Sequence, residues 1–148
     1  MSKLIFVNLP VADLAASQAF YEAIGFTNNP QFTDETAACM VLTDTIHAML
    51  LTHDKFAGFT PKTIADAKTV SEVLICISED SREDVDAMTE KALAAGGRET
   101  RERQDYGFMY GRSFEDPDGH IWEPMWMDMA GFEAAAERGE PAKDKIDA

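Results

Sequence analysis

The stretch FEDPDGHIWE, residues 114–123, decides the fold of this chain. It predicts a tight hairpin, because Asp-Pro-Asp-Gly combines a side chain that caps a turn, a proline that presets φ and a glycine that tolerates positive φ. Along the outgoing strand, alternation puts Ile121 and Glu123 on one face and Trp122 on the other. If the Ile121 face is buried, the Glu123 carboxylate lies among apolar neighbours and needs a cation, a hydrogen-bond donor or a metal ion to balance it.

The order of elements that ends in this hairpin is predicted twice along the chain. Each copy reads strand, helix and three strands, and internal duplication of this size is a fold-level feature. Either copy alone leaves one face of its sheet bare, so we expect the two to associate and enclose something. The first copy has a strand at 4–9, a helix at 13–24 and strands at 26–32, 37–43 and 46–52; the second has a strand at 70–78, a helix at 81–95 and strands at 98–103, 108–115 and 120–126.

The predicted organisation is one domain at residues 1–128. It consists of two modules, at 1–53 and 70–128, joined by a connector at 54–69, and a short helix with a flexible acidic tail follows at 129–148. Phe56 and Phe59 in the connector either pack over the end of a sheet or cover the mouth of a cavity. The first interpretation is favoured, because isolated aromatic side chains in loops usually close a core.

Composition excludes several functional classes. The 148 residues include 45% hydrophobic and 27% charged residues, which is ordinary for a globular protein. A formal net charge of −14 argues against nucleic-acid and anionic-membrane partners. No apolar run approaches the roughly 18 residues of a membrane span, and no signal peptide is recognisable, so we expect a cytoplasmic protein. Cys39 and Cys76 are interpreted as small buried hydrophobic residues in a reducing compartment.

Two segments resemble a known family. VNLPVADL at residues 7–14, followed by Ser17 and Phe20-Tyr21, resembles the first strand and helix of vicinal oxygen chelate proteins, and DPDG at 116–119 with Glu123 resembles their last hairpin. That superfamily includes glyoxalase I, extradiol dioxygenases, and bleomycin- and fosfomycin-resistance proteins. The resemblance covers residues 1–128, and with QDYGFMYGR at 104–112 it extends to an uncharacterised bacterial group of predicted lactoylglutathione lyases. It implies an α+β fold in which two βαβββ modules with curved mixed sheets enclose a cavity.

The resemblance also implies four strand positions for metal ligands. They fall at Phe6 or Asn8, at Leu50, at Glu72 and at Glu123, and only the two glutamates are clear ligand types. A zinc site usually takes at least three protein ligands. We therefore expect no cofactor or a weakly bound divalent metal with Glu72 and Glu123 as candidate ligands, and this departure argues against metal-dependent lactoylglutathione lyase activity. The three histidines, at 47, 53 and 120, are predicted to be surface or rim residues.

Two interpretations of Glu123 stay open. In the predicted hairpin register, Arg112 faces Glu123. The two side chains form either a structural ion pair or part of a site that recognises a polar small molecule. Glu72 and Glu123 are also candidates for acid–base catalysis if they lie close together. Besides Arg112 and these glutamates, the candidate substrate-binding residues are Tyr110, Phe108, Tyr106, Asn8 and Trp122.

The sequence thus predicts a glyoxalase-like protein that binds a small organic molecule and uses cavity carboxylates as a lyase or isomerase. The alternative is a non-catalytic, metal-free module that sequesters its ligand. A homodimer is expected, on the resemblance and on the apolar Met125-Trp126-Met127 segment near the end of the domain.

Overall fold

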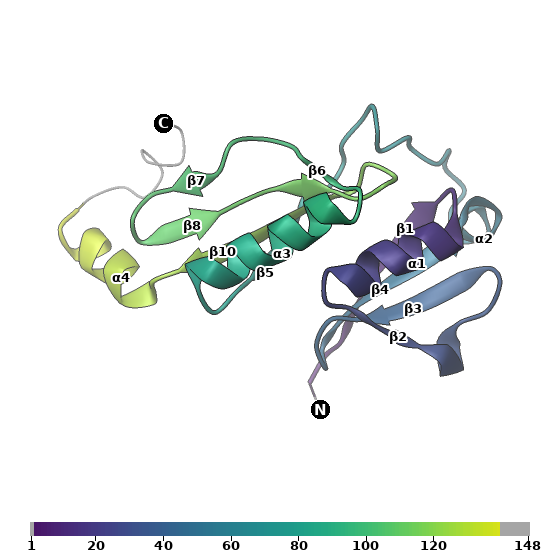
Figure 1. Cartoon of the computed structure of the whole chain (residues 1–148), viewed down its shortest axis with the longest axis horizontal. Helices are drawn as coiled ribbons and strands as arrows, with labels where there is room; N and C mark the ends of the chain where they lie inside the picture. The colour runs from purple at the N-terminus through teal and green to yellow at the C-terminus, as the bar shows by residue number, and fades with distance from the viewer. Residues whose placement is uncertain (1, 140–148) are drawn as a thin grey trace.

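Two sheets, each with one long helix on one face, follow one another along the long axis of the molecule (Figure 1). The structure is a computed structural model and describes residues 2–139. The predicted short C-terminal helix is present as α4, Met129–Glu137. The flexible tail predicted after it, at 140–148, lies outside the described residues.

The first sheet has the strand order β1-β4-β3-β2. β1 runs parallel to β4, and the other neighbours are antiparallel. Its elements are β1 Ile5–Val11, α1 Leu14–Ala23, β2 Thr27–Asn29, the short 3-10 helix η1 Pro30–Phe32, β3 Ala37–Val41 and β4 Ile46–Thr52.

The second sheet is built around β10, which pairs in parallel with β5 and antiparallel with both β8 and β9. The edge strands β6 and β7 pair with β9 and β8. Its elements are β5 Ile75–Ser78, α3 Arg82–Ala94, β6 Arg98–Glu99, β7 Gln104–Asp105, β8 Met109–Gly111, β9 Phe114–Glu115 and β10 Ile121–Met127.

The predicted α+β fold with two βαβββ modules is confirmed, with local differences. The two middle strands of the second module are each interrupted, at 100–103 and at 112–113. The strand predicted at 70–78 begins only at Ile75, and the preceding residues belong to the connector. The connector itself contains a short helix that was not predicted, α2 His53–Ala57.

Both long helices begin at a residue whose side chain caps the first turn. The Asp13 carboxylate accepts a hydrogen bond from the Ala16 N–H at 3.1 Å, and the Ser81 hydroxyl accepts one from the Asp84 N–H at 3.1 Å. Each helix is followed by a glycine with positive φ, Gly25 at +114° and Gly96 at +103°. Local sequence patterns therefore define these helices correctly.

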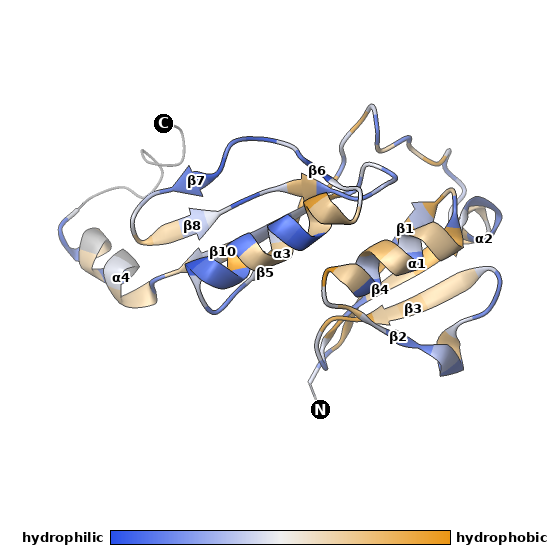
Figure 2. Ribbon diagram, in the orientation of Figure 1, coloured by the Kyte–Doolittle hydropathy of each residue, from blue (hydrophilic) through white to orange (hydrophobic). Residues whose placement is uncertain are grey.

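One hydrophobic core joins the two modules. Phe20 and Tyr21 of α1 are buried between the sheets, 6.3 Å from the Phe114 ring and 5.9 Å from the Trp122 ring, respectively, in the second module. The hydropathy colouring shows mostly apolar residues along β3 and much of α1, whereas hydrophilic and hydrophobic residues alternate along α3 (Figure 2). Because α1 contributes to both halves, the modules share a core.

The sheet face opposite the helices is only partly covered. Leu9 and Leu50 face α1 and are buried, whereas Phe6 on the other face of β1 is 47% exposed and stacks on His47 at 4.4 Å. Cys39 is buried as predicted, but Cys76 is exposed, so its predicted burial is wrong. No helix among residues 2–139 is both long and apolar enough to cross a bilayer.

Candidate functional site

A cavity of about 270 Å³ lies where β1, the connector and the hairpin before β10 meet. Its walls are mainly apolar, and the larger contributors are Phe56, Ile64, Val70, Val73, Ile75 and Ile121. Its volume is close to the lower end of ordinary ligand pockets, about 300 Å³. The predicted association of the modules therefore encloses a small space at their junction.

Besides the hydroxyl groups of Thr60, Thr63 and Ser71, the polar side chains at this cavity are Asn8 of β1, Lys62 and Glu72 of the connector, and His120 of the hairpin. Lys62 and Glu72 are the only lysine, arginine, aspartate or glutamate residues among the described residues that line it, and neither forms a salt bridge with a described residue. The cavity thus combines an apolar wall with two unneutralised charges of opposite sign.

The hairpin at residues 114–123 is held in place by the buried side chain of Asp116. Its buried carboxylate accepts hydrogen bonds from the Tyr21 hydroxyl at 2.5 Å and from the N–H groups of Asp118 and His120, both at 2.9 Å. The Trp122 indole N–H donates to the Tyr21 oxygen at 3.0 Å. Burial is the largest influence on Asp116 and raises the pKa of its carboxyl group.

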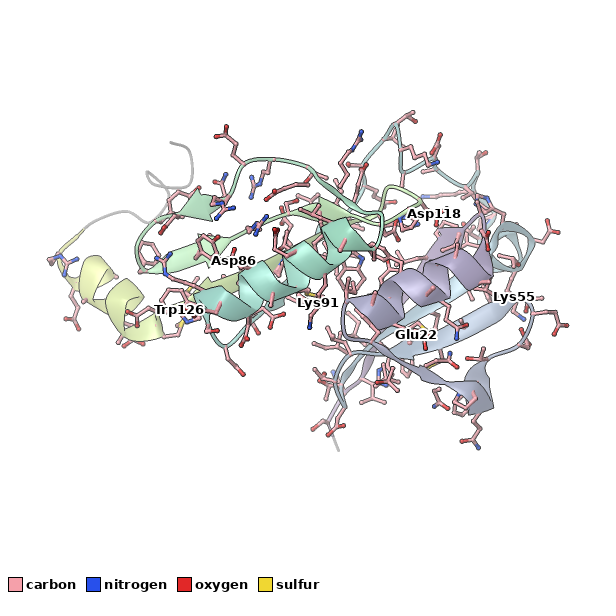
Figure 3. The ribbon with its side chains drawn as sticks, viewed as in Figure 1. Glu22, Lys55, Asp86, Lys91, Asp118 and Trp126 are labelled. Atoms are coloured by element: carbon pink, nitrogen blue, oxygen red, sulfur yellow. The ribbon has the colours of Figure 1, made fainter. Side chains whose placement is uncertain are left out.

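The same hairpin contacts the first module directly at the cavity. The Asp118 carboxylate accepts from the Ala12 N–H at 2.9 Å, so that Asp118 lies between the two modules (Figure 3). His120 Nε2 lies 2.8 Å from the Pro10 carbonyl oxygen and must donate to it, because a carbonyl only accepts. Gly119 has a φ of +96° and lies against the connector, where a Cβ atom would come within 2.6 Å of the Ala67 carbonyl oxygen. These contacts hold the hairpin against β1 and the connector.

Glu123 lies on the open face of β10 and its cation is Arg101, not Arg112. The two charged groups are 3.6 Å apart, with 20% of the Glu123 side chain exposed. Because Ile121 pairs with Glu115 and Trp122 with Phe114, the residue facing Glu123 is Ser113. The predicted Arg112–Glu123 pair is wrong, since the true register differs by one residue and this moves Arg112 to the opposite face.

Arg112 instead lies beneath α3, where its 4% exposed side chain donates to three carboxylates. It forms a two-point contact with Glu99 at 2.9 and 3.1 Å and single contacts with Asp86 and Glu90, both at 3.0 Å. The hydrogen bonds that Arg112 donates to Glu99 are the main reason that the pKa of Arg112 is raised. With these partners, Arg112 has a structural environment and does not reach the cavity.

The other aromatic candidates also lie away from the cavity. Tyr110 donates to Asp86 at 2.6 Å beneath α3, and Trp122 is fully buried in the shared core. Tyr106 donates to Gln104, and the Phe108 carbonyl accepts from Asp128 at 2.6 Å, at the far end of β10 from Ile121. Of the predicted site residues, Asn8 and Glu72 line the cavity.

Sequence reasoning missed the contribution of the connector. Lys62 and Ile64 were not singled out, and Phe56 lines the cavity, which was the less favoured of its two interpretations. Phe59 is 68% exposed and is not among the residues lining the cavity. The only indication in the sequence was the clustering of aromatic residues in a connector between duplicated modules.

The residues at the implied metal positions do not fit a three-ligand metal site. Leu50 faces α1 in the core, and the neighbour of Asn8 on the open face is Met49. Within the described part of the chain, no group of three or more histidine, cysteine, aspartate or glutamate side chains is arranged to hold a metal ion. We therefore derive no chemistry through a metal.

Comparison with known proteins supports the fold. Residues 3–42 match the family model of the bleomycin resistance protein-like N-terminal. A hypothetical protein from S. aureus superposes with a TM-score of 0.71 at 26% identity, over 85% of this chain and 94% of the other. A glyoxalase-related enzyme from Fulvimarina pelagi has a TM-score of 0.71 at 20% identity, over 85% and 88%. No curated protein matches the chain.

These findings support the resemblance to the vicinal oxygen chelate superfamily, in residues 3–42 by sequence and in the whole domain by fold. A bleomycin-binding protein in complex with bleomycin has the same fold, with a TM-score of 0.58 at 20% identity over 84% of this chain and 98% of the other. The proteins that share this fold thus include both binding proteins and enzymes. Function has to be argued from the cavity itself.

Proposed function

We propose that the chain binds a small organic molecule in the cavity between its two modules. The observation that carries this proposal is the mainly apolar cavity of about 270 Å³, with Asn8, Lys62 and Glu72 on its walls. A concave apolar pocket with a few polar groups is the usual form of a small-molecule site. The bleomycin complex of a relative with the same fold is consistent with such a role.

A cavity-filling substitution tests this proposal. Ala65 lines the cavity and is exposed, so Ala65→Trp is expected to fill the space without disturbing the core. We expect ligand-observed NMR with a set of small apolar fragments to detect binding to the original chain and at least a tenfold weaker response with Ala65→Trp. Ala19→Trp, at an exposed position of α1, is the matched control and should retain binding. Equal fragment binding by both variants would place the ligand elsewhere.

For lyase or isomerase chemistry, the cavity offers Glu72 as the general base. Glu123 is paired with Arg101 and is not among the lining residues, so we do not propose the two glutamates as a catalytic pair. Once a substrate is found, Glu72→Gln should reduce kcat by at least 100-fold, the lower range of a general-base contribution of about 10²–10⁴. Glu123→Gln should leave kcat within a few-fold. Ligand binding without turnover would favour the sequestering module.

We propose a metal-free site, because Glu72 and Glu123 alone provide too few ligands. Protein purified without added metal, and again after incubation with Zn²⁺ or Mn²⁺, should contain much less than one metal ion per chain. A stoichiometric metal that disappears in Glu123→Gln would overturn this part of the proposal.

We also propose a cytoplasmic homodimer formed through exposed apolar side chains of β1 and of the connector just before β5. Phe6, Val73 and Leu74 expose 47%, 58% and 56% of their surface, which is unusual for large apolar residues of a monomer. Trp126 of the predicted contact segment is instead stacked under Arg82 at 5.2 Å. Sedimentation at micromolar concentration should show a dimer, and Phe6→Asp should convert it to a monomer.

A further inference from the structure

We infer that the cavity selects a small apolar zwitterion, a molecule that carries one ammonium and one carboxylate group on a branched or aromatic apolar body. This inference rests on the proposed function, because it names the class of ligand that the same cavity takes. It starts from the two charged connector residues, Lys62 and Glu72, which enter the cavity ten residues apart in the chain.

The two charges are available to a ligand. Lys62 and Glu72 are exposed, they do not form a salt bridge with each other, and neither forms one with another residue of the described 2–139 segment. The backbone N–H of Lys62 donates to the Thr60 hydroxyl at 3.1 Å, which fixes the connector where the lysine side chain leaves it. A ligand therefore meets one cationic and one anionic group at a single cavity.

Charge complementarity then decides the class of ligand. A carboxylate alone would bind Lys62 but meet the like charge of Glu72, and an amine alone would have the reverse conflict. A zwitterion matches both charges. It also carries no net charge, so the formal −14 of the whole chain neither attracts nor repels it as an ion.

The other residues that line the cavity indicate the size and the apolar character of the uncharged part of the ligand. Phe56, Ile64, Val73 and Ile121 present apolar surface, and the Asn8 amide is a further hydrogen-bonding group. The volume of about 270 Å³ corresponds to the share of roughly nine water molecules at about 30 Å³ each, which indicates a ligand of about ten non-hydrogen atoms. Leucine has this size, apolar character and pair of charges, and it is a suitable probe.

The test compares leucine with three probes of similar shape: 4-methylpentanoate, which lacks the ammonium group, isoamylamine, which lacks the carboxylate, and 4-methylpentan-1-ol, which lacks both. Affinities come from chemical-shift titrations of the full chain. We expect leucine to bind at least tenfold more tightly than each of the three. Equal or tighter binding of the amine, the acid or the alcohol would overturn the zwitterion inference while leaving a small-molecule site in place.

Two substitutions assign each charge. Lys62→Met should weaken leucine binding at least fivefold and leave isoamylamine unaffected or tighter, whereas Glu72→Gln should weaken leucine binding and leave 4-methylpentanoate unaffected or tighter. Lys55→Met and Glu22→Gln remove the same charges at exposed positions that are not among the lining residues, labelled in Figure 3, and should leave all affinities unchanged.

The possible outcomes distinguish a failure of the proposed small-molecule site from a failure of the zwitterion inference. If the connector variants behave like their controls, the assignment of Lys62 and Glu72 is wrong. If no probe binds and the apolar fragments also fail to bind, the proposed function fails together with this inference. If fragments bind in the cavity but leucine does not, only the zwitterion inference fails.

Discussion

Arg112 shows how one buried guanidinium connects three elements of the second module. It follows β8 and binds Asp86 and Glu90 of α3 and Glu99 of β6. Partial burial acts to raise the pKa of Asp86, but hydrogen bonds from Tyr110 and Arg112 leave that pKa lowered. A carboxyl group whose pKa is lowered on folding contributes stability above its unfolded pKa, and this contribution is lost as the pH falls.

Arg112→Met is expected to lower the free energy of unfolding by about 2–3 kcal/mol at pH 7, the scale of hydrogen bonds to charged groups. Urea unfolding at pH 7 and at pH 3 measures this. The difference from the original chain should shrink at pH 3, because the stability that Asp86 contributes through its lowered pKa is lost as the pH falls. Arg98→Met is the control, since Arg98 is 79% exposed in its pair with Glu115 and should contribute at most about 1 kcal/mol. An equal loss in both variants would contradict a special role for Arg112.

The hairpin at 114–123 is the element that positions the cavity. Its residues Asp116, Asp118 and His120 form hydrogen bonds to Tyr21, Ala12 and Pro10, respectively, all in or next to α1 and β1. Gly119 meets the connector so closely that no side chain fits there. The turn therefore defines both the end of the sheet and one wall of the cavity.

Gly119→Ala is expected to lower the free energy of unfolding by more than a glycine-to-alanine substitution whose only penalty is the positive φ. The positive φ costs about 1–2 kcal/mol for an alanine, and the contact with the Ala67 carbonyl adds to it. Gly107→Ala is the matched control, because Gly107 has a φ of +82° and nothing within 4 Å of the added Cβ. Thermal unfolding should show a clearly larger loss for Gly119→Ala, and fragment binding should weaken only in that variant. Equal losses would mean that the connector yields to the new methyl group.

At the scale of elements, sequence patterns predict what is local. The two helices expected at 13–24 and 81–95 and the turn at Asp-Pro-Asp-Gly are present as α1, α3 and the hairpin. The register of β10 against β8 and β9 is not determined locally, because the same turn residues are compatible with two registers that differ by one residue. The shift moves Arg112 and its neighbours to the opposite face of the sheet. This single shift accounts for the wrong partner of Glu123.

At the scale of the whole molecule, duplication predicts two associated modules but not the space between them. Much of the cavity wall comes from the connector, whose sequence has no periodic pattern that predicts which side chains face inward. The modules are joined by Tyr21, which is buried and links Asp116 to Trp122 through its hydroxyl group. A link of this kind makes the two sheets one cooperative unit.

Tyr21→Phe should weaken this junction in a pH-dependent manner. Burial raises the pKa of Asp116, so the group binds more protons in the folded than in the unfolded chain, and the stability it contributes is lost as the pH rises through the raised pKa. The Tyr21 hydroxyl stabilises the charged form of Asp116. Its removal should therefore lower the free energy of unfolding little at pH 4 and by about 1–3 kcal/mol at pH 7.5, where the buried carboxylate lacks this donor.

Urea unfolding followed by tryptophan fluorescence and by circular dichroism measures this effect in both modules at once. The two transitions should coincide in the original chain, because one core joins the sheets. Tyr106→Phe, outside that core, is the control and should show no such dependence on pH. Transitions that separate in the original chain would mean that each module unfolds by itself, and the cavity would then depend on the hairpin contacts alone.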